Sequence, residues 1–579
     1  MRLPLRAFVI SLVLLSAAEL SAPTPATAQS ASQITPRSFS PPIQRNSEGG
    51  FTIGELPALE TPAGAENLFV TLSSVSVSTE SPELTGRGAA VRAELVGQRV
   101  SGAQIFAAAQ KLEAAYARAG YVLVRVILPP QQLVDGAELH LTVIDGYIER
   151  VETAQVPDAV RRRIEQTLRP LLGKHGLKLK EIERRILLAS DTPGILLRST
   201  LAPGSEIGAA VLIIEAKHQS IDGTLSGDNS LSRYLGSYQI GLGADLNSVF
   251  REGELIYLRA NGDPGGGSNG FFKDQPRNRT LAAGFIAPLG IEGLTFNLEG
   301  TDAHTTPLQT GGSQSTDVFE RLSVRLRYPW IRSRDFNWAS QLVFDAESEH
   351  ENLILPAPLP LFDDRLRILR LAQNWNGVNR MGGDFSGTFT TSYGFDGLGA
   401  RSGAAATPAL PLSRQGAGAN FAKLEASSSY TQGLAAHLNA AVTARAQYAF
   451  GRALERSEQV GIADPDDLSA FDAGSLQGDS GVIVRTEVAS PWMLPTRSTR
   501  VGLLASPYVF AAVGEVYSAD PTSFEAAHVR GGSYGAGLRL GGAAAGSFSS
   551  ASLALEVAHQ TGGAIRDVSR FRLVAALKF

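Results

Sequence analysis

The C-terminal segment constrains the fold most strongly, because its side chains alternate in polarity and it ends on an aromatic residue. Side chains of a β-strand point alternately to its two faces, so Arg572 and, less cleanly, Val574 and Ala576 would lie opposite the apolar residues. Such a pattern is typical of the closing strand of an outer-membrane β-barrel, with lipid on one side and a wet lumen on the other. The apolar face would carry Ala575 together with Phe571, Leu573, Leu577 and Phe579, and we expect the last four to act as the signal for barrel assembly.

The N-terminal segment has the parts of a secretory signal peptide. Arg2 and Arg6 precede an apolar run at 7–18, and small residues follow it. We therefore expect residues 1–28 to be cleaved. The apolar run is too short to span a bilayer, and no later segment approaches the roughly eighteen apolar residues that a spanning helix needs. Any membrane crossing would therefore use strands.

Composition favours a large all-β body and excludes several kinds of chemistry. Glycine is frequent, at 60 residues, and there is no cysteine, so neither disulfides nor thiol catalysis is available. The net charge of −4 gives no reason to expect nucleic acid as a partner. The 8 histidines are scattered without metal-ligand spacing. We assign no catalytic residue, no metal and no cofactor.

The chain divides into a linker, two small domains and a long strand-rich region. Residues 29–65 are rich in Pro, Ser and Gly without a period, which predicts a linker or tether; a short plug helix is not visible in the pattern. Residues 66–150 predict an α+β domain. Residues 151–218 predict a second one with the same order of elements, and residues 219–579 consist of short alternating segments.

Apolar spacing places the elements of these regions. In the first domain, Ser101 would cap a helix over 101–119 and Gly120 would end it. The expected strands of this domain cover 69–72, 75–77, 121–128 and 139–144. The second domain would have helices over 158–172 and 179–189 and strands over 195–201 and 209–215. In the C-terminal region, strict alternation over 322–328 and 438–450 gives strands with one apolar and one polar face. The lumen lining would include Arg325, Arg327, Arg445 and Arg485.

Short motifs in both domains resemble a known family. The second domain is similar to the second periplasmic domain of two-partner secretion transporters, the haemolysin-activator and filamentous-haemagglutinin-transporter family. The first domain is similar to that family's first polypeptide-transport-associated (POTRA) domain. The motifs are Glu183-Arg184-Arg185-Ile186-Leu187-Leu188, Asp191-Thr192-Pro193-Gly194 and Thr200-Leu201-Ala202-Pro203-Gly204 in the second domain, and Tyr116, Gly120-Tyr121, Leu128-Pro129, Gln131 and Asp145-Gly146-Tyr147-Ile148 in the first. The resemblance implies α+β POTRA domains followed by an all-β transmembrane barrel of sixteen antiparallel strands.

The resemblance extends to a loop that folds into the barrel in this family. The loop positions are Ser469, Ala470, Phe471, Asp472, Gly474, Gly478, Asp479 and Gly481, and Arg485 and Glu487 follow on the next strand. The facing strand would carry Phe510, Ala512 and Gly514. The family normally has an arginine where this chain has Ser469, and an aspartate where it has Ala512.

The two replacements would remove both partners of an ion pair. Losing both is nearly neutral, whereas losing one leaves an unpaired charge that costs about 3–5 kcal/mol. Either the loop moves more readily, or Asp472, Asp479, Arg485 and Glu487 hold it by other contacts. A competing alignment would place the family motif at 529–531, after the strand that should follow the loop.

Some residues also fit other interpretations. Gly478-Asp479-Ser480-Gly481 is also the nucleophile motif of chymotrypsin-like proteases, but only about forty residues separate His437 from Ser480, and that triad needs two barrels. Tyr116 and Tyr121 could contact a substrate in the first domain, although core aromatics are the commoner case.

The resemblance implies a transporter in the bacterial outer membrane, with its POTRA domains in the periplasm. It would capture an unfolded partner polypeptide, such as an adhesin, a haemolysin or a hemophore-type protein, and export it through the barrel. Other expected partners are outer-membrane lipid, the barrel assembly machinery and periplasmic chaperones. The alternatives are an insertion factor for outer-membrane proteins, which usually has more POTRA domains, and a passive porin. The sequence leaves the cargo and the oligomeric state open.

Overall fold

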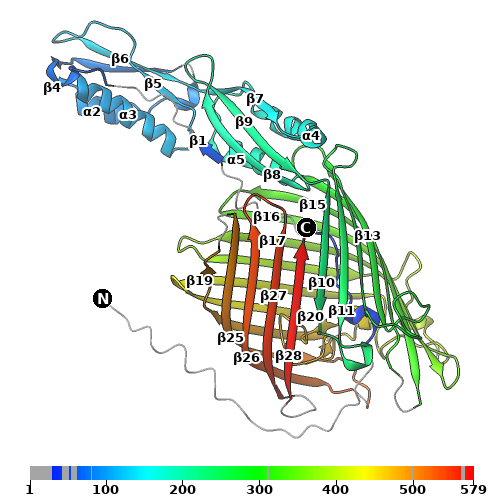
Figure 1. Ribbon diagram of the computed structural model, residues 1–579. Coiled ribbons are helices and arrows are strands. Elements are labelled where there is room, and N and C mark those ends of the chain that lie inside the picture. The colour runs from blue at the N-terminus through cyan, green and yellow to red at the C-terminus, as the bar shows by residue number, and fades with distance from the viewer. Residues whose placement is uncertain are drawn as a thin grey trace.

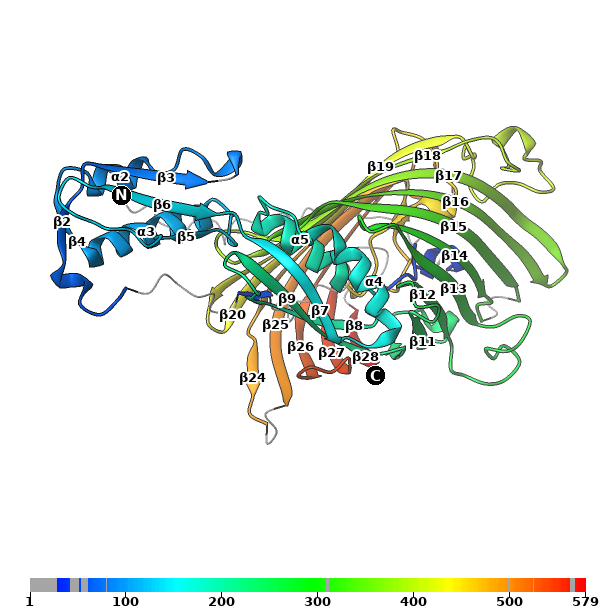
Figure 2. The ribbon, with the colours of Figure 1, turned by 90° about the horizontal axis from the view of Figure 1, so that it is seen from above.

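The computed structural model describes residues 29–41, 51–53, 61–79, 81–308, 312–496, 500–523, 525–562 and 568–579. The predicted signal peptide, 1–28, lies outside the described residues. Two small α+β domains follow one another away from one end of a large barrel (Figures 1 and 2). Within the described ranges, no helix is long and apolar enough to cross a membrane.

The first domain packs two helices against a three-stranded sheet. Ser101 caps the long helix, since its hydroxyl accepts the N–H of Gln104 and the Gln104 side chain accepts the N–H of Ser101. The sheet order is β3-β6-β5, with β3 parallel to β6, and β2 pairs with β4. The elements are β2 (Phe69–Thr71), β3 (Ser74–Thr79), α2 (Ala89–Leu95), β4 (Arg99–Ser101), α3 (Gly102–Arg118), β5 (Arg125–Ile127) and β6 (Glu138–Ile144).

The second domain begins earlier than the sequence predicts. Strand β7 starts at Tyr147 and pairs with β9, so residues 147–150 belong to the second domain and not to the first. Its elements are β7 (Tyr147–Gln155), α4 (Asp158–Leu168), α5 (Leu179–Ser190), β8 (Ile195–Pro203) and β9 (Ala209–His218). Strand β1 (Phe51–Ile53), from the predicted linker, adds to β8 in parallel. The linker prediction is therefore wrong for this stretch.

The C-terminal region closes into a barrel. The fold class predicted from the sequence is confirmed: sixteen antiparallel strands form the wall, with β24 continuing β23. Its strands are β10 (Ile221–Asp228), β11 (Gln239–Asn247), β12 (Leu255–Gly262), β13 (Asn278–Leu289), β14 (Leu294–Thr305), β15 (Gln314–Arg332), β16 (Phe336–Leu355), β17 (Leu359–Val378), β18 (Asp384–Gly394), β19 (Phe421–Ala435), β20 (Leu438–Tyr448), β23 (Ser480–Ala489), β24 (Trp492–Leu494), β25 (Val501–Tyr517), β26 (His528–Ala544), β27 (Ser550–Gly562) and β28 (Ser569–Lys578).

The C-terminal strand closes the ring. Strand β28 pairs with β27 on one side and with β10 on the other, and the Phe579 N–H donates to the Gly223 carbonyl. Phe571, Leu577 and Phe579 are exposed on the outer face, and Leu573 is half-buried. Arg572 is buried in the lumen.

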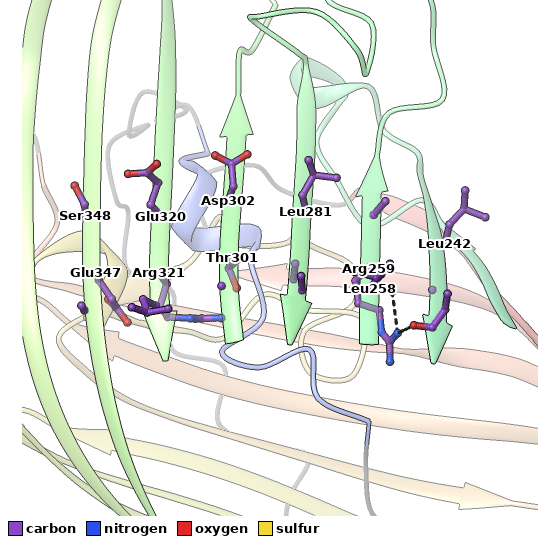
Figure 3. Close-up of a pocket in the computed structure, with 18 of the residues that line it drawn as sticks. Leu242, Leu258, Arg259, Leu281, Thr301, Asp302, Glu320, Arg321, Glu347 and Ser348 are labelled. Carbon is purple, nitrogen blue, oxygen red and sulfur yellow. Dashed lines mark hydrogen bonds between the residues drawn. The ribbon is translucent and has the colours of Figure 1, made fainter. Parts of the chain in front are cut away.

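The barrel wall has an apolar outer face and a charged inner face. On β12 the side chain of Leu258 is 49% exposed outside, whereas its neighbour Tyr257 is fully buried inside. Figure 3 shows this part of the wall, where a hollow of about 880 Å³ runs along β11 to β17. Leu242, Leu258 and Leu281 contribute apolar surface to it, and Arg321 belongs to the inner face.

Residues 29–41 lie inside the barrel, which corrects the linker prediction for this stretch. They form the short helix α1 (Ala31–Ile34) followed by an irregular segment. Ala31 is fully buried against Ala303 and Phe319 of the wall. Figure 2 shows this dark-blue helix within the ring of strands. We call residues 29–41 the lumen segment.

Candidate functional site: the occupied lumen

The lumen segment bridges the wall and the inward loop. The Ala31 N–H donates to Asp317 Oδ1 at 2.8 Å, and the Ser32 N–H donates to Glu349 Oε1 at 3.3 Å. On its other side, Gln33 Nε2 donates to Gln477 Oε1 of the loop at 2.6 Å. The segment therefore lies in the channel between the barrel wall and the inward loop and is hydrogen-bonded to both.

Two cavities flank the lumen segment. One, of about 610 Å³, is lined by Thr35 and Arg37 together with the inward loop. The other, of about 470 Å³, is lined by Ser40 and Pro41 and opens toward the second small domain. Among the arginines predicted to line the lumen, Arg325 and Arg327 border the second cavity, and Arg445 borders the first. Arg485 is buried beneath the inward loop.

The inward loop, residues 449–479, is anchored by an apolar core. Leu468, Ala470 and Phe471 pack with residues of β23, β25 and β27, including Phe510 and Ala512. Within the loop, β21 (Val460–Gly461) pairs with β22 (Gln477–Gly478). The loop is therefore a packed part of the lumen.

The wall supplies arginines where the resemblance led us to expect an arginine on the loop. Arg572 Nε on β28 donates to the Ser469 carbonyl at 2.5 Å, and Arg572 Nη2 donates to the Phe471 carbonyl. Arg485 Nη1 on β23 donates to Ser469 Oγ at 3.3 Å, and the Ala470 N–H donates to Ser533 Oγ at 3.1 Å. The polarity of the expected lock is thus reversed.

Arg485 lies next to Ala512, where the resemblance led us to expect an aspartate. It is the cross-strand partner of Ala512, and its guanidinium lies 3.7 Å from the centre of the Phe510 ring. Arg485 Nη2 also donates to Glu556 Oε2 at 2.6 Å. One buried cation therefore has a carboxylate, an aromatic face and the loop as partners, as buried charge requires.

The loop's aspartates have separate partners. Asp472 pairs with Arg570 of β28, and Asp479 accepts both Arg414 Nη1 contacts, at 2.6 and 2.7 Å. Glu487 does not reach the loop and pairs with Arg539 instead, at 2.7 Å. Of the four residues suggested as alternative loop contacts, Asp472, Asp479 and Arg485 therefore make contacts that hold the loop.

Glycines allow the loop and wall to approach closely. A Cβ at Gly478 would lie 2.8 Å from the Tyr517 carbonyl oxygen, and one at Gly481 would lie 2.8 Å from that of Glu515. A Cβ at Gly514 would lie 2.9 Å from the Ile483 side chain. Gly474 has a φ of 74°, which a side chain would disfavour.

The loop also has a buried ion network. Although burial alone would raise the pKa of Glu458, Arg370 and Lys423 together hold that pKa well below its usual range. Arg370 contacts both Glu458 oxygens, at 2.7 and 2.9 Å, and Lys423 Nζ lies 2.9 Å from Glu458 Oε2. Glu458 therefore ties the loop to β17 and β19.

The motif region of the second domain docks on the periplasmic turns of the barrel. Arg184 Nη2 donates to the Pro329 carbonyl at 3.0 Å, and Arg185 Nη1 donates to the Ile291 carbonyl at 3.1 Å. Asp191 accepts two hydrogen bonds from Arg332, at 2.6 and 2.9 Å. Gly194, with a φ of 68°, has no room for a Cβ beside Gln219.

The two tyrosines of the first domain belong to its core. Tyr116 is fully buried and its hydroxyl donates to the Leu84 carbonyl at 2.5 Å; Tyr121 is 7% exposed. Both rings are therefore part of the domain core in this structure, and a substrate contact by either tyrosine stays a prediction. The burial of its ring raises the pKa of Tyr116.

The rival interpretations fail on geometry. Gln447 pairs with Gly481 and Asn439 with Ala489, so Ser480 lies opposite Tyr448, eleven residues along the strand pair from His437, or roughly 35 Å at ~3.3 Å per residue. Residues 529–531 lie in β26, paired with β25, and do not form an inward loop. Among the described residues, no group of three or more acidic or histidine side chains could hold a metal ion.

Several contacts that hold the loop were not found from the sequence. Arg414, Ser533 and Glu556 come from distant strands or loops, and no local pattern marks them. Arg572 did have a signal, as the charged residue within an apolar closing strand.

Comparisons with known proteins agree with this architecture. The sequence model of the haemolysin secretion/activation protein family ShlB/FhaC/HecB matches residues 208–540, and that of the ShlB-type POTRA domain matches residues 78–146. CdiB from Escherichia coli has a similar fold, with a TM-score of 0.68 and 20% identity over 92% of this chain and 95% of that one. CdiB from Acinetobacter baumannii has a TM-score of 0.58 and 14% identity, covering 94% of each chain.

A curated relative is similar over a shorter range. The heme/hemopexin transporter protein HuxB of Haemophilus influenzae strain 86-028NP is 22% identical over 264 residues, 45% of this chain and 44% of that protein. The match thus spans less than half the length of this relative. The family match covers more than half of the chain, and the chain therefore belongs to the haemolysin secretion/activation protein family ShlB/FhaC/HecB.

Proposed function

We propose that this protein exports a partner polypeptide across the outer membrane by two-partner secretion. The barrel lies in the outer membrane and its POTRA domains lie in the periplasm. The observation that carries the proposal is the lumen segment, because a stretch of polypeptide already passes through the channel between wall and loop. A lumen that holds one chain segment has the width and the polar groups to hold another.

The POTRA domains would collect the client before it enters the barrel. In the first domain, β3 and β5 form the two edges of the described sheet. An extended client can add to such an edge through main-chain hydrogen bonds, which give affinity without requiring one sequence. The second domain's β8 edge carries the chain's own β1, so the first domain offers the more accessible edges.

The cargo class is an extension of the similarity to HuxB. The name of that protein refers to transport of heme and hemopexin. A secreted haem-scavenging partner is therefore one candidate class, beside adhesins and haemolysins. The neighbouring reading frame should encode a large secreted β-rich protein.

Secretion from cells that express this chain with that neighbouring frame tests the proposal. Deleting residues 66–146 should abolish the appearance of the partner outside the cell, while heat-modifiable migration shows that the barrel is still assembled. Unimpaired export by the deletion variant would contradict the proposal. Depletion of the full chain separates the insertion-factor alternative, since loss of an insertion factor lowers many barrel proteins at once.

A further inference from the structure

The irregular half of the lumen segment is held mainly by its backbone. Pro36, Arg37 and Ser38 all have exposed side chains within the lumen. The main-chain carbonyls of Pro36 and Arg37 and the N–H of Phe39 nevertheless meet charged partners on the wall. A segment selected only as a specific stopper would be expected to bury its side chains.

Three wall residues hold this backbone. Arg321 Nη2 donates to the Pro36 carbonyl at 2.8 Å, and Arg325 Nη2 donates to the Arg37 carbonyl at 3.1 Å. Glu299 Oε2 accepts the Phe39 N–H at 2.9 Å. The wall therefore presents donors and an acceptor to successive carbonyl and N–H groups.

The wall residues are fixed by one another. Arg325 lies 3.0 Å from Glu299 Oε1 and donates to Asn297 Oδ1 at 2.7 Å. The Tyr257 hydroxyl donates to Glu299 Oε2 at 2.7 Å. Glu299 is 1% exposed, and Arg321 and Arg325 are each 5% exposed. These contacts join wall residues to one another and do not depend on the lumen segment, so the binding groups are preorganised.

Side-chain contacts in this stretch are few. Arg37 Nη1 lies 2.5 Å from Glu425 Oε2. Ser38 Oγ donates to Glu299 Oε2 at 3.4 Å and to Ser40 Oγ at 3.2 Å. These contacts add to the backbone contacts but do not enclose either side chain.

We propose that Glu299, Arg321 and Arg325 form a main-chain binding site of the export path, which residues 36–39 occupy as a resident stand-in for cargo. The ligand class is an extended polypeptide of little sequence preference, which needs a free N–H at the position of Phe39. The inference rests on the proposed function, because the cargo must pass the position that the lumen segment occupies.

Proline substitution in the full-length chain separates backbone from side-chain recognition. The chain has no cysteine, so Ser30→Cys, at a position 2% exposed, reports release of the segment by its thiol-labelling rate. In that background Phe39→Pro removes the N–H that Glu299 accepts and should speed labelling about tenfold or more, the loss expected for one hydrogen bond to a charged group. Phe39→Ala, which removes only the ring, should change the rate less than about threefold.

Two controls address sterics and the wall. Ser38→Pro introduces the same proline ring one residue earlier. The N–H of Ser38 donates to nothing among the described residues, so this substitution should leave labelling of Cys at position 30 slow. Arg321→Ala with Arg325→Ala should speed labelling, whereas Arg327→Ala, the same residue type on the same face of β15, should not. Fast labelling in Phe39→Ala and slow labelling in Phe39→Pro would overturn the proposal.

A peptide experiment tests the ligand class. The full-length Phe39→Pro variant is placed in planar bilayers, and a synthetic peptide of residues 33–41 or an unrelated Ser/Thr-rich peptide of equal length is added. Both should block conductance with affinities within about tenfold of each other, and N-methylation at the position of Phe39 should weaken the block by the native peptide. Block by the native peptide alone, insensitive to N-methylation, would show a sequence-specific stopper and overturn the inference. Partner secretion is measured separately, so its loss would remove the proposed function even where main-chain binding is found.

Discussion

At the scale of single residues, the inward loop is held by arginines of the wall, the opposite polarity to the one that the resemblance led us to expect. The wall arginines Arg485 and Arg572 reach the loop at Ser469, and the small residue Ala512 is the cross-strand partner of Arg485. Charge-assisted hydrogen bonds to main-chain carbonyls are stronger than neutral ones. The loop can therefore be held without an arginine of its own.

A double-mutant cycle tests this reversed polarity. Ser469→Arg alone would add a third cation beside Arg485 and Arg572, and we expect it to destabilise the loop by about 3–5 kcal/mol, as for an uncompensated buried charge. Adding Ala512→Asp should recover a large part of that loss. Protease sensitivity of residues 449–479 and thermal unfolding in detergent measure both effects. Equal destabilisation by the single and the double variant would contradict the expectation.

Arg572 should contribute more to the loop than its position in the closing strand suggests. Arg572→Ala removes two hydrogen bonds to loop carbonyls, each worth about 1.5–3 kcal/mol for a charged donor. We expect faster cleavage within 449–479 and larger conductance fluctuations. Lys578→Ala is the matched control on the same face of β28, because Lys578 contacts only Asp222, at 4.0 Å, among its described ion pairs. Equal behaviour of the two variants would argue against this role.

At the scale of elements, the regular parts of the fold could be predicted and the irregular parts could not. Helix α3 has an apolar stripe and a Ser101 cap, and both signals lie within the element itself. The predicted domain boundary falls inside strand β7. The strand belongs to the second domain because it pairs with β9, and no local sequence pattern shows that pairing. Residues 29–41 show no helical or strand periodicity in their apolar residues. Their conformation is set by contacts with charged wall residues that lie hundreds of positions away in the sequence.

The candidate site shows the same limit. The loop positions around Phe471 could be aligned by their motifs, but the residues that hold them come from strands whose register is set by the closed barrel. Ser533 of β26 meets the Ala470 N–H only because β26 lies beside β25 in the ring. Polar contacts between distant strands leave no trace in the spacing of either strand.

Docking of α5 on the barrel can be tested through one ion pair. Asp191→Asn keeps the shape of the side chain but weakens its two hydrogen bonds with Arg332. The side chain of Asp191 is 19% exposed and that of Arg332 is 11% exposed. We expect a loss of about 1–3 kcal/mol in docking free energy. Hydrogen exchange of α5 should then rise. Glu181→Gln, in an exposed pair with Lys174, should leave the exchange unchanged; a rise in both variants would mean that charge alone was responsible.

At the scale of the whole molecule, closure of the ring decides whether the lumen exists at all. Strand β28 pairs with β10 through residues 574–578 and with β27 through most of its length. Without β28, two strand edges would face lipid, where each unsatisfied main-chain group costs several kcal/mol. The lumen segment, the loop contacts of Arg572 and the closed wall all depend on this one strand.

Ending the chain after Val574 should therefore prevent assembly of the barrel. The truncation removes four of the five pairs that join β28 to β10, with 575–578, and it also removes the Phe579 contacts at Gly223. We expect loss of heat-modifiable migration and a large fall in the amount recovered from the outer membrane. Lys578→Ala, which keeps the main-chain pairing, should assemble normally. Heat-modifiable migration of the truncated chain would show that residues 569–574 of β28 suffice to close the ring, and the apolar C-terminal face would then need another role.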